Sequence, residues 1–392
     1  MQAPQQLGTD HLHLAIPLDQ QAAFSGQGTK GLTPLQFGVG ALAGGLFGWL
    51  AERSDYCARS AYDELFLKTP NRAYSNFMAI NAAPERRGRF NQLWQVSIAA
   101  LSAIIAVSLA AQMDLISIDG ARQHQAPLNL FGLFFGTLLF GVGMGLSRGC
   151  VSRLIILSGR GNVRAFITLI FLSLFSWSAI SGVLAVPRIT FASLVRFDYA
   201  PLLSNSLVAI WVMFLLATIV TILRCGGADQ PLKRAIMAGL IGLLVPVCFF
   251  ITAVIGADEF DPVPVEGLRF ILPVADSLGY FVYSTALAPK FGLGLVGGTL
   301  IGAVLSAKLS GRIVIEGFNN APHPLRYILG AFCMAFGGVI AGGCTVGWLL
   351  TGGSVLNGGA LIAFVGFGLG NLSLRLSFIS GFLDADAAVS RV

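Results

Sequence analysis

Charged side chains are scarce in this sequence. Only 11% of its 392 residues are Asp, Glu, Lys or Arg, whereas 55% are hydrophobic. A soluble domain carries about a quarter charged residues to cover its surface, so this composition excludes an ordinary water-soluble protein. Lipid must therefore solvate much of the chain. The 48 glycines agree with this, because glycine lets membrane helices approach closely.

Features that mark several other classes of protein are also missing. The sequence has no GxxxxGK[ST] phosphate-binding motif, so we expect no ATP hydrolysis in this chain. Its six cysteines form no CxxC pair and its four histidines lie outside the apolar segments, so no metal site, cofactor or disulfide framework is expected. The net charge of +6 is explained by membrane topology and not by nucleic-acid binding. Residues 1–30 are polar and lack a signal-peptide pattern, which predicts a tail outside the lipid.

Apolar segments recur along the rest of the chain. A helix needs roughly 20 apolar residues to span a bilayer, and nine segments meet or approach this length: 34–52, 92–113, 128–147, 163–186, 206–224, 234–256, 291–310, 325–343 and 358–380. Lys and Arg concentrate in the connections on one side. The positive-inside rule then places the N-terminus outside and the C-terminus in the cytoplasm. The sequence thus predicts an all-α, multi-pass protein of the bacterial inner membrane.

An internal repeat organises these spans. GVGMGLSRGCVSRLIILSGRG and AFGGVIAGGCTVGWLLTGGSV align when Cys150 is placed on Cys344, and the predicted topology makes the two copies inverted. Spans one to four then correspond to spans six to nine. The predicted units are a polar tail at 1–33, a first membrane repeat at 34–190, a connecting helix at 191–232 and a second repeat at 233–392. The connections 53–90 and 257–290 are each long enough for two short amphipathic or re-entrant helices.

The segment that follows each Gly-Cys pair is apolar but too short to span. VSRLIILS and TVGWLLT are bounded by glycines and are typical of re-entrant half-helices. If each helix begins at its cysteine, two N-termini with free N–H groups and partial positive charge face a common centre and form an anion site. Gly149 and Gly343 allow close backbone approach, and Arg148 and Arg153 add attraction at the cytoplasmic mouth.

The cysteines differ in the roles that their surroundings predict. Cys150 and Cys344 follow glycine at matching repeat positions, so we expect them to contact the ion. A neutral thiol is a weak donor with a soft sulfur, which suits an anion with a terminal sulfur. Because a helix N-terminus lowers the pKa of a thiol, burial has to keep it protonated. Three other cysteines, in apolar runs or at a helix end, are expected to be structural: Cys225, Cys248 and Cys333.

Charged and glycine-rich stretches elsewhere have simpler interpretations. Cys57 lies in the charged segment AERSDYCARSAYDE, which is typical of the mouth of a path. Its charged neighbours are predicted to be solvated at the membrane edge or in a loop: Glu52, Arg53, Asp55, Arg59, Asp63 and Glu64. A stripe of glycines is typical of helix packing rather than a pore lining: Gly40, Gly44, Gly45 and Gly48.

Three segments together resemble a known family. ER…YCARSAYDE, SRGCVSRL and AGGCTVGWLLTGGS are similar to the YeeE/YedE-type sulfur-transport proteins, and the resemblance covers roughly residues 36–380. It implies thiosulfate uptake, and in some members a link to selenium. It also implies nine membrane helices with short helices around an hourglass-like path, a relay of three cysteines, and a cytoplasmic sulfurtransferase as partner. The candidate path residues are Cys57, Cys150, Cys344, Gly149, Gly343, Thr345 and Arg148.

Two alternatives to a thiosulfate transporter stay open at this point. A membrane sulfurtransferase or thiol oxidoreductase would use the same cysteines as nucleophiles, but no residue in the sequence is placed as a general base beside one of them. A channel for another small solute or a selenium compound is the other alternative, since paired half-helices also suit neutral molecules. The transporter is the interpretation that we favour, and we expect no enzyme activity.

Overall fold

The computed structural model describes residues 33–66, 91–113, 115, 130–194, 231–255, 265–284, 289–317 and 324–376. In these ranges the ordered elements are helices, and one isolated β-bridge joins Asn162 to Glu316. The all-α prediction is therefore confirmed. The predicted tail, the span at 206–224, Cys225 and all four histidines lie outside the described residues.

Each of the other predicted spans coincides with a helix. These helices are α2 (Thr33–Ser54), α5 (Asn91–Gln112), α7 (Leu130–Ser147), α9 (Val163–Ser181), α12 (Pro231–Ile255), α14 (Phe291–Leu309), α15 (Pro324–Ile340) and α16 (Gly358–Leu376). Within the described ranges, five helical stretches are long and apolar enough to cross a membrane: 92–112, 130–159, 163–181, 232–253 and 291–309. The chain is thus a multi-pass membrane protein, and its full number of spans stays a prediction.

Five shorter helices complete the described fold: α3 (Ala58–Phe66), α8 (Val151–Gly159), α10 (Ala185–Leu194), α13 (Ile271–Val282) and the π-helix η2 (Gly347–Gly352). The connections 53–90 and 257–290 each hold one of them, α3 and α13. The predicted short helices after Cys150 and Cys344 are α8 and η2. A separate α10, which follows a break after Ser181, was not expected from the sequence.

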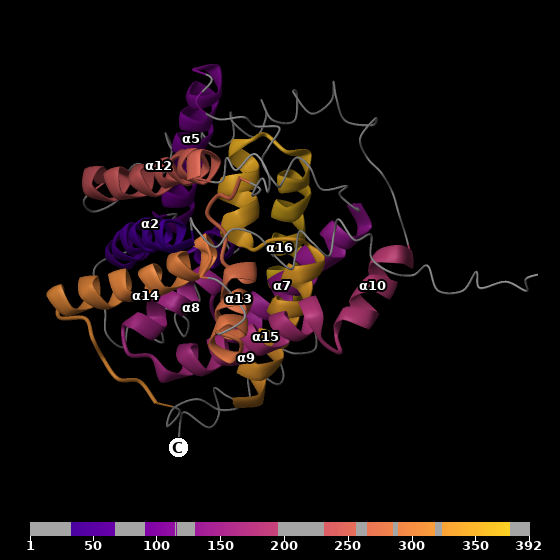
Figure 1. Cartoon of the computed structure of the whole chain (residues 1–392). Helices are drawn as coiled ribbons and strands as arrows, with labels where there is room; N and C mark the ends of the chain where they lie inside the picture. Colours follow the sequence, from indigo (N-terminus) through magenta and orange to yellow (C-terminus); the bar gives the residue numbers. More distant parts are fainter. Residues whose placement is uncertain are drawn as a thin grey trace, which may run out of the picture.

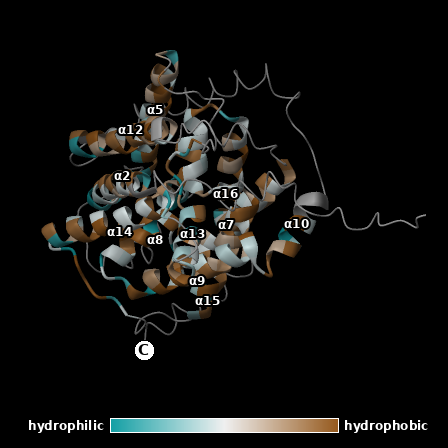
Figure 2. Cartoon of the chain, viewed as in Figure 1, coloured by the Kyte–Doolittle hydropathy of each residue, from teal (hydrophilic) through white to brown (hydrophobic). Residues whose placement is uncertain are grey.

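The long helices form two groups with short helices between them (Figure 1). α2, α5, α12 and α14 pack together, as do α7, α9, α15 and α16. The short helices α3, α8, α13 and η2 each contact both groups. Many large apolar residues of the long helices are exposed, and in Figure 2 much of the ribbon of these helices is brown, the hydrophobic end of the scale. The polar breaks that precede the short helices are thus enclosed between the two groups, and the outer faces suit lipid.

Glycines set the spacing between α2 and α14. A Cβ atom added at Gly40, Gly44 or Gly48 would lie only 2.1–2.3 Å from a carbonyl oxygen of α14, namely that of Phe291, Leu295 and Thr299 in turn. These three glycines therefore serve helix packing, as predicted. Residue numbers increase in the same order along both helices at these contacts, so α2 and α14 run in the same direction.

The same close approaches give the direction of α7 against its neighbours. Gly136 lies against Ala341 and Gly143 lies against Met334, so α7 and α15 run antiparallel. Gly141 lies against Phe367 and Gly145 lies against Leu374, so α7 and α16 run parallel. These relative directions agree with the topology that the Lys and Arg distribution predicts.

Packing also follows the exchange that the internal repeat predicts. The predicted repeat pairs α2 with α12, α5 with α14, α7 with α15 and α9 with α16. When the members of each pair are exchanged, the contact of α2 with α14 becomes the contact of α12 with α5, and the structure contains both contacts. The contacts of α7 with α16 and of α9 with α15 are related in the same way. Each group of long helices therefore takes two members from each half of the chain, so neither half can bury its core alone.

Candidate functional site: three cysteines at helix starts

Cysteine stands directly before a helix at three places in the structure. Cys57 precedes α3, Cys150 precedes α8, and Cys344 precedes the short helical segment that contains η2. Each cysteine carbonyl accepts the first main-chain bond of its helix, from the N–H groups of Ala61 at 3.2 Å, Leu154 at 2.9 Å and Trp348 at 2.9 Å respectively. The three thiols are therefore placed at helix N-termini, where free N–H groups and a partial positive charge favour anions.

A left-handed residue lies two positions before each of these cysteines. Asp55 has φ 54°, Arg148 has φ 59° and Gly342 has φ 68°. A residue other than glycine in this conformation costs about 1 kcal/mol or more. The chain therefore makes the same sharp break three times, each time turning a cysteine to the start of a new helix.

Cys57 and Cys150 lie together. The two thiols are close enough to interact, and only 3% of Cys57 and 1% of Cys150 are exposed. Ser152 adds a hydroxyl oxygen 3.3 Å from the Cys150 sulfur. The Cys57 N–H donates to the Oε1 atom of Gln92 at 3.1 Å, which ties this turn to α5. The short helices α3 and α8, which are far apart in the sequence, thus bring their N-termini into one buried cluster.

Cys344 has a separate environment. Its Sγ atom accepts a hydrogen bond from the Gly347 N–H at 3.5 Å, so the sulfur caps its own helix. The Trp348 indole N–H donates to the Ala341 carbonyl at 2.9 Å and fixes the break before the cysteine. A Cβ atom at Gly343 would lie 2.9 Å from the Trp348 ring, so the glycine makes room for this ring. The sequence reasoning missed Trp348, although glycines flank it in GGCTVGWLLTGG.

Helix α7 ends shortly before Cys150, and helix α15 ends shortly before Cys344. Because the two helices pack antiparallel, these C-terminal ends lie at opposite ends of the α7–α15 pair. The end of α7 at Ser147 lies beside Gly330 near the start of α15, whereas Ala341 just after α15 lies beside Gly136. With a rise of 1.5 Å per residue, the two helix ends are roughly 16 Å apart along the pair. The sequence predicted that the Cys150 and Cys344 tips face each other, but the thiol that contacts Cys150 belongs to Cys57.

An ion network adjoins the Cys57–Cys150 end. Arg160 donates to the Glu52 carboxylate at 2.9 Å and to Asp55 at 2.6 Å. Arg312 lies 3.7 Å from Glu52 and 3.8 Å from Asp55, and Arg153 lies 3.4 Å from Asp55. Burial by itself would lower the pKa of Arg160, but Asp55 and Glu52 more than offset it, so the pKa is raised and the guanidinium stays charged.

The prediction that these charges are solvated at the membrane edge was wrong for several of them. Glu52 is fully buried, because Arg160 and the Ser306 hydroxyl bind its two carboxylate oxygens. Arg59 is also buried, with its guanidinium 3.8 Å from Asp63.

Asp63 and Glu64, the two acidic residues of α3, were predicted to be solvated charges in a loop, and this prediction was also wrong. Asp63 is buried and accepts a hydrogen bond from Asn371 at 2.7 Å. Glu64 accepts the N–H groups of Gln92 at 2.9 Å and Leu93 at 2.8 Å, so it caps the start of α5. Both acids are therefore structural partners that fix α3 against α16 and α5.

The remaining candidate residues occupy the two breaks. Arg148 is half-buried, Gly149 is buried, and Thr345 is buried directly after Cys344. A Cβ atom at Gly149 would meet only ordinary contacts, the nearest 3.5 Å away on Leu154. Cys248 is fully buried in α12 and Cys333 is half-buried in α15, and both lie within a helix, not at its start.

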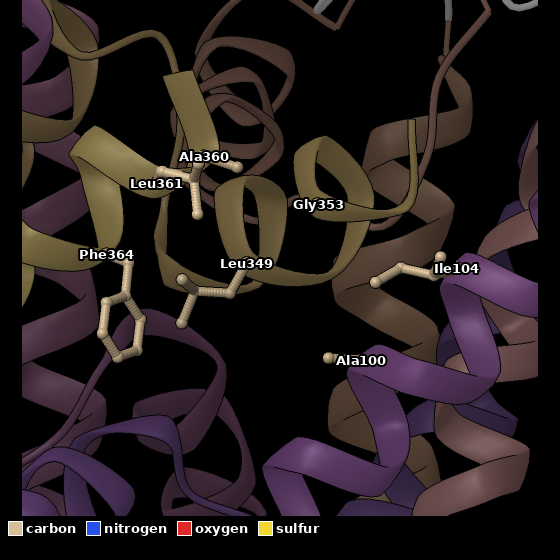
Figure 3. A pocket seen from close by; sticks show the side chains of 7 residues that line it. All are labelled: Ala100, Ile104, Leu349, Gly353, Ala360, Leu361 and Phe364. Carbon is tan, nitrogen blue, oxygen red and sulfur yellow. The ribbon is translucent and has the colours of Figure 1, made fainter. Parts of the chain in front are cut away.

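One pocket in the described structure has an apolar lining. Its lining comes from α5, η2 and α16 (Figure 3) and consists of Ala100, Ile104, Leu349, Gly353, Ala360, Leu361 and Phe364. No cysteine and no charged residue lines it, so it does not suit an anion. The three helix-starting cysteines are 1–3% exposed. Access to these thiols from solvent therefore requires a shift of the surrounding helices.

Comparison with known proteins gives one family and two relatives. Residues 53–373 match the family described as sulphur transport. The thiosulfate transporter TsuA of Spirochaeta thermophila is 26% identical over 360 residues, which cover 86% of this chain and 97% of that protein. The thiosulfate transporter TsuA of Escherichia coli is 21% identical over 336 residues, which cover 79% of this chain and 85% of that protein.

Proposed function

Because this chain belongs to the sulphur transport family, we propose that it takes up thiosulfate or a related small sulfur-containing anion along a path formed by Cys57, Cys150 and Cys344. The observation that carries the proposal is that all three buried cysteines start helices after the same left-handed break. The names of the two relatives, both thiosulfate transporters, support the choice of substrate.

The proposed path uses neutral donors and helix dipoles to bind an anion in a dry interior. Helix N-termini offer free N–H groups, and each thiol adds a polarisable sulfur. Cys344 receives the anion at one end of the α7–α15 pair, and the Cys57–Cys150 cluster receives it at the other. Passing the ion between several weak sites keeps binding favourable enough to enter and weak enough to leave.

The proposal includes a membrane arrangement, which rests on the distribution of Lys and Arg. We place the chain in the bacterial inner membrane with its N-terminus outside and its C-terminus in the cytoplasm, which puts the Cys57–Cys150 end on the cytoplasmic side. The antiparallel packing of α7 and α15 supports an inverted repeat. In this arrangement α8 and η2 are re-entrant half-helices. A cytoplasmic sulfurtransferase that accepts the delivered anion is the proposed partner.

Uptake of radiolabelled thiosulfate into cells or proteoliposomes tests the path. We expect the Cys344→Ala protein to insert normally and lose uptake, because it lacks the thiol at the start of its half-helix. Cys248→Ala and Cys333→Ala are matched controls, since these cysteines lie within helices α12 and α15, and both should keep wild-type uptake. Wild-type uptake by Cys344→Ala would contradict the proposed path.

The same experiment separates the alternative functions. An enzyme that uses these cysteines as nucleophiles would leave a persulfide on Cys57, Cys150 or Cys344, which intact-protein mass spectrometry after incubation with thiosulfate would detect. A pore for other small solutes would tolerate replacement of all three cysteines. For a transporter we expect loss of uptake in the variants and no covalent adduct on the wild-type protein.

A further inference from the structure

Arg153 is a buried cation whose hydrogen-bonding capacity is only partly used. Its side chain is 6% exposed, and its Nη2 atom lies 3.4 Å from Asp55. The Nε and Nη1 atoms are buried and have no hydrogen-bond partner among the described residues. An unsatisfied buried donor on a charged group is costly, so a guanidinium kept in this state points to a ligand that is bound there at another stage.

The position of Arg153 identifies where that ligand sits. The residue lies in the first turn of α8, three positions after Cys150, and its charge acts on the Cys57 thiol. Its side chain also lies against the break itself, since a Cβ atom at Gly149 would be 3.7 Å from the Cβ and Cγ atoms of Arg153. The guanidinium therefore lies beside Asp55, two residues before Cys57, and the base of the side chain lies against the break before α8.

In this structure, Asp55 is the acidic residue that pairs with Arg153. It also accepts a hydrogen bond from Arg160 at 2.6 Å and lies 3.8 Å from Arg312. Its carboxylate would keep two cationic neighbours after leaving Arg153. An anion that arrives at Arg153 can thus replace the carboxylate without leaving it unpaired.

We infer that Arg153 is the anion-binding side chain of the Cys57–Cys150 end of the path, and that the carboxylate of Asp55 competes with the substrate for it. The inference rests on the proposed function for the identity of the anion. A tetrahedral sulfur oxyanion suits the site, because its oxygens match the planar fork of donors on Arg153 and its terminal sulfur faces the thiols. Return of Asp55 to Arg153 then helps to release the ion.

Two substitutions with opposite effects test the competition. Arg153→Gln removes the charge and the donor fork, so the Kd for radiolabelled thiosulfate, measured on purified protein, should rise about tenfold or more. Asp55→Asn keeps a side chain that accepts the left-handed conformation but removes the competing charge. Its Kd and the KM for uptake should both fall severalfold, and its maximal rate should fall because release is slower.

Glu316→Gln provides the matched control. The Arg164–Glu316 pair has the same 3.4 Å separation as Arg153–Asp55 and similar burial, with side chains 9% and 29% exposed against 6% and 26%. This variant should keep the wild-type Kd and KM. Arg153→Lys, which retains a point charge without the fork, should bind with intermediate affinity. The combined fall of KM and maximal rate in Asp55→Asn is a result that loss of structure does not produce.

The outcomes for this site and for the proposed function can be told apart. A wild-type Kd in both Arg153→Gln and Asp55→Asn would overturn the role of Arg153, even if uptake is normal. The expected changes in Kd, together with no uptake by any form of the protein, would support the binding site and overturn transport. A lower KM in Glu316→Gln equal to that in Asp55→Asn would show a general effect of charge and overturn the competition.

Discussion

Gly149 and Gly343 occupy the same place in the two repeated segments, yet they meet different neighbours. A Cβ atom at Gly343 would lie 2.9 Å from the ring of buried Trp348, whereas one at Gly149 would find its nearest neighbour at an ordinary 3.5 Å. The glycine that the sequence aligns is therefore required sterically only in the second segment.

Alanine substitution at Gly343 can therefore be tested with the same substitution at Gly149 as its control. Gly343→Ala should lower the free energy of unfolding by about 1–3 kcal/mol, the usual cost of overpacking, and should reduce uptake because it displaces Trp348 beside Cys344. Gly149→Ala should have little effect on either quantity. Thermal unfolding in detergent and thiosulfate uptake measure the two variants, and equal behaviour would show that Trp348 does not fix the second break.

The residues of the site were predictable to different degrees. The repeated Gly-Cys pair and the short apolar stretch after it placed Cys150 and Cys344 at helix starts, because local sequence sets a helix boundary. The contact between Cys57 and Cys150 and the burial of Glu52 under Arg160 were not predictable in this way. They join residues about a hundred positions apart, and no local pattern distinguishes a charge that is solvated at a membrane edge from one that is paired across the fold.

At the scale of elements, glycine decides how closely helices pack. The carbonyl oxygen of Leu295 lies 2.1 Å from the place where a Cβ atom of Gly44 would be, and it belongs to a helix backbone that cannot turn aside. Gly297, on the same pair of helices, has no neighbour within 4 Å of a built Cβ atom. The glycine stripe of α2 was predicted to serve helix packing, but only the packing shows which glycines of α14 contact it.

Alanine at these two positions should therefore act in opposite directions. Gly44→Ala forces α2 and α14 apart, and its cost of about 1–3 kcal/mol exceeds the 0.5–1 kcal/mol or so that alanine gains over glycine within a helix. Gly297→Ala should be neutral or slightly stabilising. Thermal unfolding midpoints of the purified proteins test this, and a Gly44→Ala protein as stable as Gly297→Ala would contradict the packing of α2 on α14.

At the scale of the whole molecule, the two halves of the chain are interleaved and not separate. Each group of four long helices takes two members from each half, and the short helices that start at cysteines lie between the groups. A relative movement of the two groups would change the surroundings of all three thiols together. This arrangement gives a physical basis for opening the proposed path, whose cysteines are buried in the described structure.

The sidedness of the molecule can be tested with two exposed positions. Val183, between α9 and α10, is 86% exposed and lies near the predicted outer end of the span 163–186; Ile315, after α14, is 83% exposed and is predicted to lie in the cytoplasm. In intact cells a membrane-impermeant maleimide should label Val183→Cys at once. It should label Ile315→Cys only after the membrane is permeabilised, with the unsubstituted protein as the background. The reverse pattern would turn the molecule over and place the Cys57–Cys150 end, with Arg153, on the outer side, so that Cys344 would be the last thiol before release into the cytoplasm.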